Sequence, residues 1–129
     1  MTLADQLAYR IRELPEMTGV PVRSYSDDAD ENEQVVLRPV QGYSENTMAP
    51  VFNVHIDVRT RAIGYRRAED LCVAAFDALR WHIPNREGGA YVHAPPLVSM
   101  SPGYIGDDER GRPVYGFTLV YTVTPDKMK

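Results

Sequence analysis

The sequence predicts an α+β fold in which an antiparallel β-sheet of about four strands carries two helices packed on one face. Two segments repeat apolar residues at the spacing of an amphipathic helix, and residues 51–60 alternate apolar and polar side chains as a half-buried strand does. The order helix, strands, helix, strands favours a single antiparallel sheet with both helices on the same face.

Residues 2–14 predict the first helix. Its apolar residues are separated by four, four and three positions, so they share one face: Leu3, Leu7, Ile11 and Leu14. Thr2 can cap the first turn, and Pro15 discourages the helix from continuing. We therefore expect this helix to bury one apolar stripe against the sheet.

An acidic segment at about 24–34 follows a short strand expected around Val20–Tyr25. The segment holds five acidic residues and little apolar area, so burial cannot offset the entropy lost on ordering it. We expect it to form a mobile acidic loop within a single domain that spans residues 1–129.

The middle of the chain predicts two strands. Val35–Leu37 should form a short strand that Pro39 ends, with a turn-prone connection over residues 41–50. Residues 51–60 should form a longer strand, with these side chains on its core face: Phe52, Val54, Ile56 and Val58. The opposite face is then either solvated or an interface.

The second half of the chain predicts the longer helix, Tyr65–His82, followed by two strands at about 90–101 and 113–124. The helix stripe comprises Ala68, Leu71, Cys72, Ala75, Phe76 and Leu79. The polar stretch Gly106–Arg112 can turn a hairpin between the two strands. Pro95 and Pro96 place the first of these strands at a sheet edge or give it a bulge.

Composition limits the classes of partner. The net charge of −4 argues against sequence-independent nucleic-acid binding, and no sequence-specific nucleic-acid contact is expected. We interpret the nearby cations as a solvated face: Arg59, Arg61, Arg66 and Arg67. No apolar run is long enough for a membrane span, no signal peptide is recognisable, and the single cysteine excludes an intrachain disulfide. A soluble intracellular protein with no membrane partner is expected.

The residues that carry chemistry predict no catalytic, cofactor-binding or metal site. His55, His82 and His93 lack the close spacing of zinc ligands, and His82 is expected at a helix end that suits a cation. Cys72 lies on the apolar stripe of the second helix, which predicts a buried packing role instead of a nucleophile. Asp107–Glu109 predicts a charged hairpin turn in preference to a calcium or glycosidase site.

Two stretches carry a resemblance to a known family. Pro50–Arg59 leads into the Ala68–Trp81 helix, and Pro102–Arg112 leads into a final aromatic strand, with Gly106–Arg112 the most specific part. The chain resembles the tail terminator and minor capsid proteins of long-tailed bacteriophages. The resemblance implies a non-enzymatic virion protein, assembled in the host cytoplasm and located at the head-proximal end of the tail. It also implies a homo-oligomeric ring, usually a hexamer, that stops tube polymerisation and joins the tail tube protein to a head–tail connector protein.

The hypothesis divides the surface into two kinds of contact. The expected oligomer interface comprises Asn53, His55, Asp57, Arg59, Thr118 and Thr122. The loops expected to meet a partner contribute Asp27, Asp28, Asp30, Glu31, Asp107, Asp108, Glu109, Arg110 and Arg112. Two alternatives stay open. One is a head-completion or connector protein, and the other is a small α+β enzyme or ligand-binding module that uses His55, Asp57 and the Asp107–Glu109 turn in one pocket.

Overall fold

A computed structural model describes residues 2–46, 51–84, 90–92 and 94–125. The helices are α1 (Leu3–Arg12), the short 3-10 helix η1 (Pro15–Met17) and α2 (Tyr65–Leu79). The strands are β1 (Val22–Ser24), β2 (Gln34–Asn46), β3 (Val51–Arg61), β4 (Ala90–Val92), β5 (Leu97–Asp107) and β6 (Pro113–Pro125). The fold is α+β as predicted, with six strands where the sequence indicated about four.

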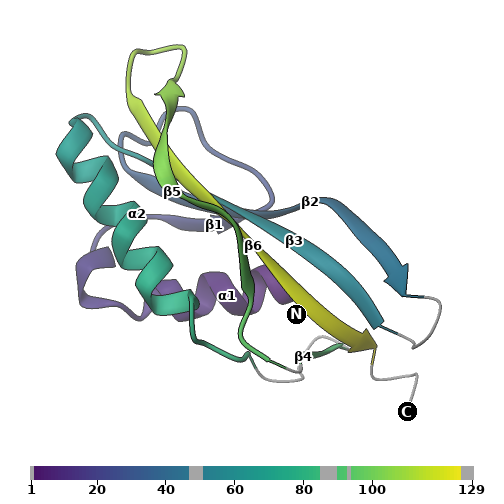
Figure 1. Ribbon diagram of the computed structural model, residues 1–129. Helices are drawn as coiled ribbons and strands as arrows, with labels where there is room; N and C mark the ends of the chain where they lie inside the picture. Colours follow the sequence, from purple (N-terminus) through teal and green to yellow (C-terminus); the bar gives the residue numbers. More distant parts are fainter. Residues whose placement is uncertain (1, 47–50, 85–89, 93, 126–129) are drawn as a thin grey trace.

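The six strands form one sheet in the order β1-β2-β3-β6-β4, and β5 pairs with β6 beside β4 (Figure 1). All described pairs are antiparallel except β1 with β2, which is parallel and was not predicted. The sheet therefore has an edge at β1 and β2 and another at β4 and β5.

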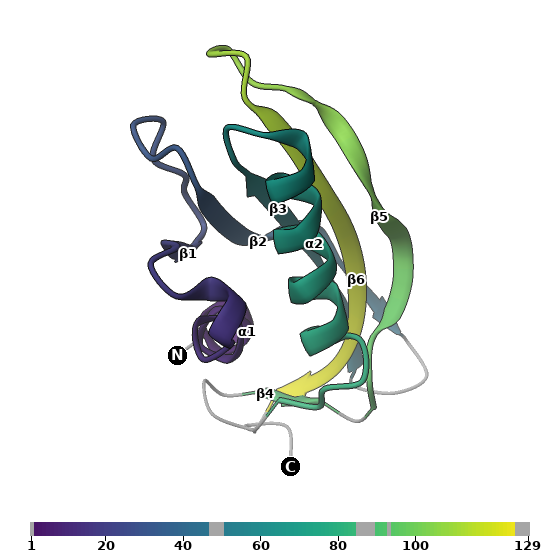
Figure 2. The same ribbon diagram turned by 90° about the vertical axis from the view of Figure 1, so that its left-hand side faces the viewer.

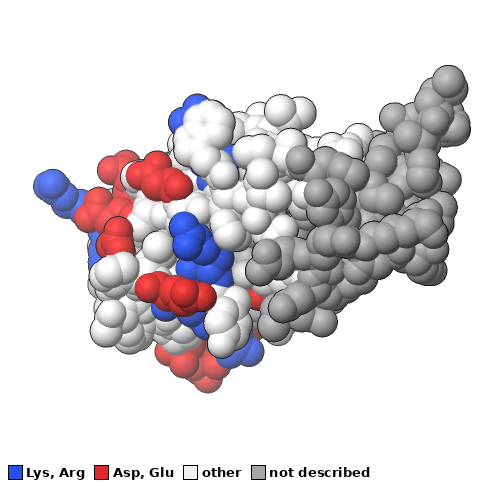
Figure 3. Space-filling view, turned by 90° about the horizontal axis from the view of Figure 1, so that it is seen from below, with Lys and Arg blue, Asp and Glu red and all other residues white. Residues whose placement is uncertain are grey.

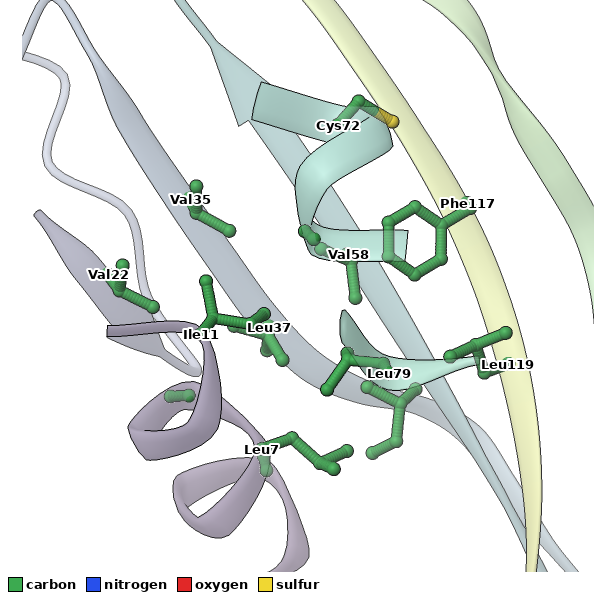
Figure 4. Close-up of a cluster of buried hydrophobic side chains, with 14 of the residues drawn as sticks. Leu7, Ile11, Val22, Val35, Leu37, Val58, Cys72, Leu79, Phe117 and Leu119 are labelled. Carbon is green, nitrogen blue, oxygen red and sulfur yellow. The ribbon is translucent and has the colours of Figure 1, made fainter. Parts of the chain in front are cut away.

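Both α-helices cover the same face of this sheet, as the sequence predicted (Figure 2). Alternate residues of the strands point toward the helices, among them Ile56 and Val58 in β3 and Phe117 and Leu119 in β6. These side chains and the apolar stripes of α1 and α2 form one buried cluster (Figure 4). None of the described helices is long and apolar enough to cross a bilayer.

The helix ends follow local chemistry. Thr2 and Asp5 form a reciprocal capping box at the start of α1, which satisfies two backbone N–H groups. The helix ends at Arg12, two residues earlier than expected, and Pro15 begins η1. The second helix also ends early, at Leu79, so His82 lies outside it.

The predicted end of the second strand at Pro39 was wrong, because β2 continues to Asn46. Among the described residues, β1 pairs only with Val35–Leu37. At Pro39, therefore, no described strand pairs with the edge of β2 that faces away from β3. A missing N–H is tolerated at such an edge. The register of β2 against β3 shifts between Val40 and Ser44, inside the predicted turn.

The predicted strand at 90–101 is two strands, β4 and β5, with Pro95 and Pro96 between them. Both pair with β6, and β5 extends to Asp107 with three register shifts, so the expected edge and bulge are both present. The hairpin between β5 and β6 is confirmed. Its turn closes through a 2.9 Å bond from Asp108 N to Arg112 O, and Gly111 supplies a φ of 74°.

Candidate functional site

The structure brings the two predicted partner-contacting loops together at one end of the sheet. Arg112 donates to the carbonyl oxygens of Ala29 (2.7 Å) and Glu31 (3.0 Å), and Arg110 pairs with Asp30 at 3.0 Å. Loops about 80 residues apart in sequence therefore form one surface. We call this surface, formed by residues 27–31 and 107–112, the loop end.

A third arginine, Arg61 at the end of β3, binds the backbone of the acidic segment. Its guanidinium donates to the carbonyl oxygens of Asp28 (2.6 Å) and Glu31, and pairs with Asp27 at 3.3 Å. The interpretation of Arg61 as part of a solvated face was wrong, since it is only 6% exposed. Backbone carbonyls in a turn accept hydrogen bonds that a local sequence pattern does not reveal.

Asp108 is the acid that both buried arginines share. It accepts bonds from Arg112 N (2.8 Å) and Arg112 Nε (2.9 Å), and its carboxylate lies 3.6 Å from Arg61 Nε. Partial burial raises the pKa of Asp108, but the hydrogen bonds from Arg112 outweigh it and leave the pKa below its usual value. Asp108 is therefore ionised at neutral pH and organises the hairpin turn.

Charges of both signs are interspersed on the molecule. Figure 3 shows acidic and basic side chains beside one another on the face that it presents. At the loop end these contacts are the ion pairs described above, and just outside it Arg67 forms a further pair with Glu33 at 2.8 Å. Asp107 and Glu109 belong to the same hairpin, and Asp107 accepts a 2.7 Å bond from Tyr104. The loop end thus carries charges of both signs, several of them in ion pairs.

The six residues predicted as an oligomer interface all lie in β3 and β6, on the outer face of the sheet, which none of the described helices covers. Asp57 is only 3% exposed and accepts bonds from Arg59 Nε (2.7 Å) and Thr118 (3.2 Å). Further along the same face, Thr122 donates to Asn53 at 3.2 Å. The strand register places Asp57 opposite Thr118 and Asn53 opposite Thr122, so the pairs follow from the pleat.

His55 lies on this outer face, opposite Val120. The Asp107–Glu109 turn begins at Asp107, which pairs with Pro113. Val120 lies seven positions after Pro113 in β6, which at about 3.3 Å per residue is roughly 23 Å. The structure therefore does not bring together the groups that the enzyme alternative required.

Burial determines the chemical behaviour of the remaining candidate groups. Cys72 is fully buried, and burial raises the pKa of its thiol to about 11, as expected of a packing residue. Burial, helped by nearby Arg10, lowers the pKa of His82, which lies beyond the end of α2. His93 lies outside the described residues. Within the described ranges, no group of His, Cys, Asp or Glu is placed to hold a metal ion.

Comparison with known proteins decides the family. Residues 9–125, most of the chain, match the family model described as bacteriophage tail terminator protein. The chain belongs to the bacteriophage tail terminator family. It is therefore a structural protein of the phage virion tail, in agreement with the resemblance seen in its sequence.

Solved structures share the fold of this tail protein. A chain from the virion of a native gene transfer agent particle is 16% identical, with a TM-score of 0.70 over 95% of this chain and 94% of that chain. A second solved chain is 15% identical, with a TM-score of 0.60 over 95% of this chain and 91% of the other. No curated protein matches the sequence.

Two features of the site escaped sequence reasoning. The buried arginines Arg61 and Arg112 act on carbonyl groups 30 or more residues away along the chain. Arg61 could have been suspected from the alternation of β3, since it follows Asp57 and Arg59 on the same face. The contacts of Arg112 with residues 29–32 had no local signal at all.

Proposed function

We propose that this tail protein forms a closed ring, a hexamer, at the head-proximal end of the tail, where it stops growth of the tube and presents a surface for head–tail joining. In this proposal the loop end contacts an axial partner, either the tail tube protein or the head–tail connector protein. The outer face of the sheet contributes to contacts between neighbouring copies. Assembly takes place in the host cytoplasm.

The observation that carries the proposal is the convergence of two charged loops at one end of the sheet. An end surface that must recognise one partner needs side chains held in fixed positions, because ordering them on binding would weaken the contact. Arg61 at the end of β3 and Arg112 in the turn just before β6 are almost completely buried and bind the loop backbone. The acidic segment is thereby joined to the rigid sheet at several points.

The charges that remain exposed supply specificity. Asp30 and Arg110 form a pair in which both side chains are largely exposed, and Glu109 lies beside them in the hairpin turn. Exposed charges of this kind contribute little to folding but steer partners and reject wrong ones. We therefore expect salt to weaken the contact with the axial partner, since counterions screen such charges.

The direct test mixes the purified protein with polymerising tail tube protein and measures tube lengths by electron microscopy. The expected result is shorter tubes with a ring of this protein at one end, and a six-fold average of that ring. A variant with Asp30→Lys and Glu109→Lys should lose binding to its axial partner while keeping the ring. A matched control, Asp77→Lys with Glu13→Lys, changes the net charge equally at an exposed position of α2 and at the exposed C-cap of α1, and should bind normally.

Two results would contradict the proposal. One is a protein that stays monomeric at every concentration, both alone and with tubes. The other is a ring that binds the connector but leaves tube length unchanged, which would assign the protein to head completion instead. Binding of the loop-end variant to each partner separately identifies which axial neighbour the loop end meets.

A further inference from the structure

We propose that copies of this protein join head to tail through two specific flanks of the sheet: an apolar flank at β5 and a basic flank at β1. The β5 flank consists of Tyr65, Leu97, Val98, Tyr104, Ile105 and Asp107. The β1 flank consists of Arg23, Tyr25 and Arg38. The inference rests on the proposed ring and names the contact that would close it.

The β5 flank exposes apolar side chains on both sides of an edge strand. Leu97 is 73% exposed and Tyr104 51%, and Val98 and Ile105 are also exposed. Val98 lies opposite Leu119, on the helix-covered side of the sheet, whereas Leu97 lies opposite Val120, on the outer side. A partner at this edge can therefore cover two apolar rows at once.

The same strand lacks the charges that normally protect an edge. No Asp, Glu, Lys or Arg occurs between residues 94 and 106. Monomeric proteins usually place charged side chains on such edges to prevent association. Pro102 and the register shifts of β5 limit backbone pairing with another strand, so we assign the contact to side chains.

Aromatic rings and carboxylates border this apolar edge. The Tyr104 ring lies 5.7 Å from that of Tyr65 and 5.5 Å from that of Tyr115, and Tyr104 donates to Asp107. Neither Asp107 nor Glu69 forms an ion pair with any residue that the structure describes. Exposed tyrosines beside carboxylates that have no cationic partner among the described residues suit a partner surface that is basic and partly aromatic.

The opposite edge of the same sheet has those properties. Arg38 is exposed and makes no ion pair within the described ranges, and Arg23 lies across from Val36 on the same outer side. Tyr25, which is 45% exposed, follows β1 with a φ of 75°. A positive φ is costly for an aromatic residue, and such strain is often found where a side chain is held for a contact.

The placement of the two flanks determines the type of assembly. They lie at opposite edges of one sheet, and they differ in charge and in composition. A contact between different surfaces repeats from copy to copy in one direction and closes into a ring when the rotation permits. In such an assembly the β5 flank of one copy contacts the β1 flank of the next copy.

The test uses two variants that each break one flank. The first carries Leu97→Glu and Ile105→Glu, and the second carries Arg23→Glu and Arg38→Glu. Mass is measured by light scattering under the condition in which the wild type forms its ring, with or without tubes. Each variant alone should be monomeric. An equimolar mixture should form a one-to-one dimer, because one intact flank from each variant can still meet, and that recovery shows that both are folded.

Control variants of the same residue types separate the flanks from general surface changes. Ile83→Glu alters an exposed isoleucine beyond the end of α2, and Arg10→Glu alters an exposed arginine near His82; both should keep the ring. If the wild type forms a ring and either flank variant still does so, the flank assignment is overturned while the proposed function stands. A mixture that stays monomeric also overturns it. A wild type without any ring removes the proposed function itself.

Discussion

The two faces of the central strands are built from alternate residues of the same segments, yet they are held in different ways. Toward the helices, Phe117 and Leu119 lie in a fully buried apolar cluster. On the outer face, Asp57 and Thr118 are held by polar bonds to neighbours in the sheet, and no described helix covers them. One face therefore supplies stability by apolar burial, whereas the other is ordered by hydrogen bonds between side chains of neighbouring strands.

The largest contrast should come from adjacent residues of β6. Phe117→Ala removes a fully buried ring that packs edge-on against Phe76 at 5.2 Å, and should lower the free energy of unfolding by about 3–5 kcal/mol. Thr118→Ala removes one hydrogen bond to Asp57 and should cost about 1 kcal/mol. Urea denaturation of both variants measures the difference. Equal losses would mean that the outer face contributes to folding as much as the core.

The second contrast concerns the arginines of the loop end. Arg61→Met leaves the carbonyl groups of Asp28 and Glu31 without their donor and should destabilise the protein by about 3 kcal/mol. Arg110→Met removes only an exposed pair with Asp30 and should cost less than about 1 kcal/mol. Amide hydrogen exchange of residues 27–33 should accelerate strongly in the first variant only. Fast exchange in the wild type as well would support the mobile loop that composition predicted.

A third contrast tests the close approach of β3 and β6. A methyl group on Gly116 would lie 2.7 Å from the carbonyl oxygen of Val58 and 3.0 Å from Arg59 Cδ. Backbone cannot yield easily there, so Gly116→Ala should cost about 1–3 kcal/mol. Gly103→Ala, whose methyl would meet nothing closer than 3.9 Å, is the control in the neighbouring strand. A fall in melting temperature confined to the first variant is expected.

The sequence predicted what depends on local periodicity. The apolar stripes of both helices and the alternation of β3 depend on side chains three to four, or two, positions apart, and these elements appeared where expected. The continuation of β2 beyond Pro39 was missed. A strand tolerates proline where no described neighbour pairs with that side of it, and this depends on the assembled sheet, not on the local sequence.

The loop end could be predicted only in part. Both charged loops were recognised by composition, but their meeting depends on Arg112 reaching Ala29, 83 residues away. Arg61 shares the outer face of β3 with Asp57 and Arg59, and this alternation was the one usable signal; Arg112 precedes β6 and had none. Contacts between a guanidinium and backbone carbonyls place no constraint on the identity of the accepting residues, so the loop sequence cannot reveal them.

The smallest expected effect is a pH dependence that separates the loop end from the core. The pKa of Asp108 is lowered in the folded protein, so its contribution to stability is present above the unfolded value of about 4 and is lost as the pH falls through the lower folded value. Asp108→Asn keeps an oxygen for the backbone N–H groups of Arg110 and Arg112 but removes the charge that faces Arg112 Nε. Stability of the variant, measured by urea denaturation from pH 7 to pH 2.5, should fall less steeply at the acid end than that of the wild type.

Asp5, whose pKa is also lowered, is present in both proteins, so the difference between the two curves reports Asp108 alone. Parallel curves would show that the carboxylate charge does not stabilise the loop end, and that the backbone hydrogen bonds of the turn suffice.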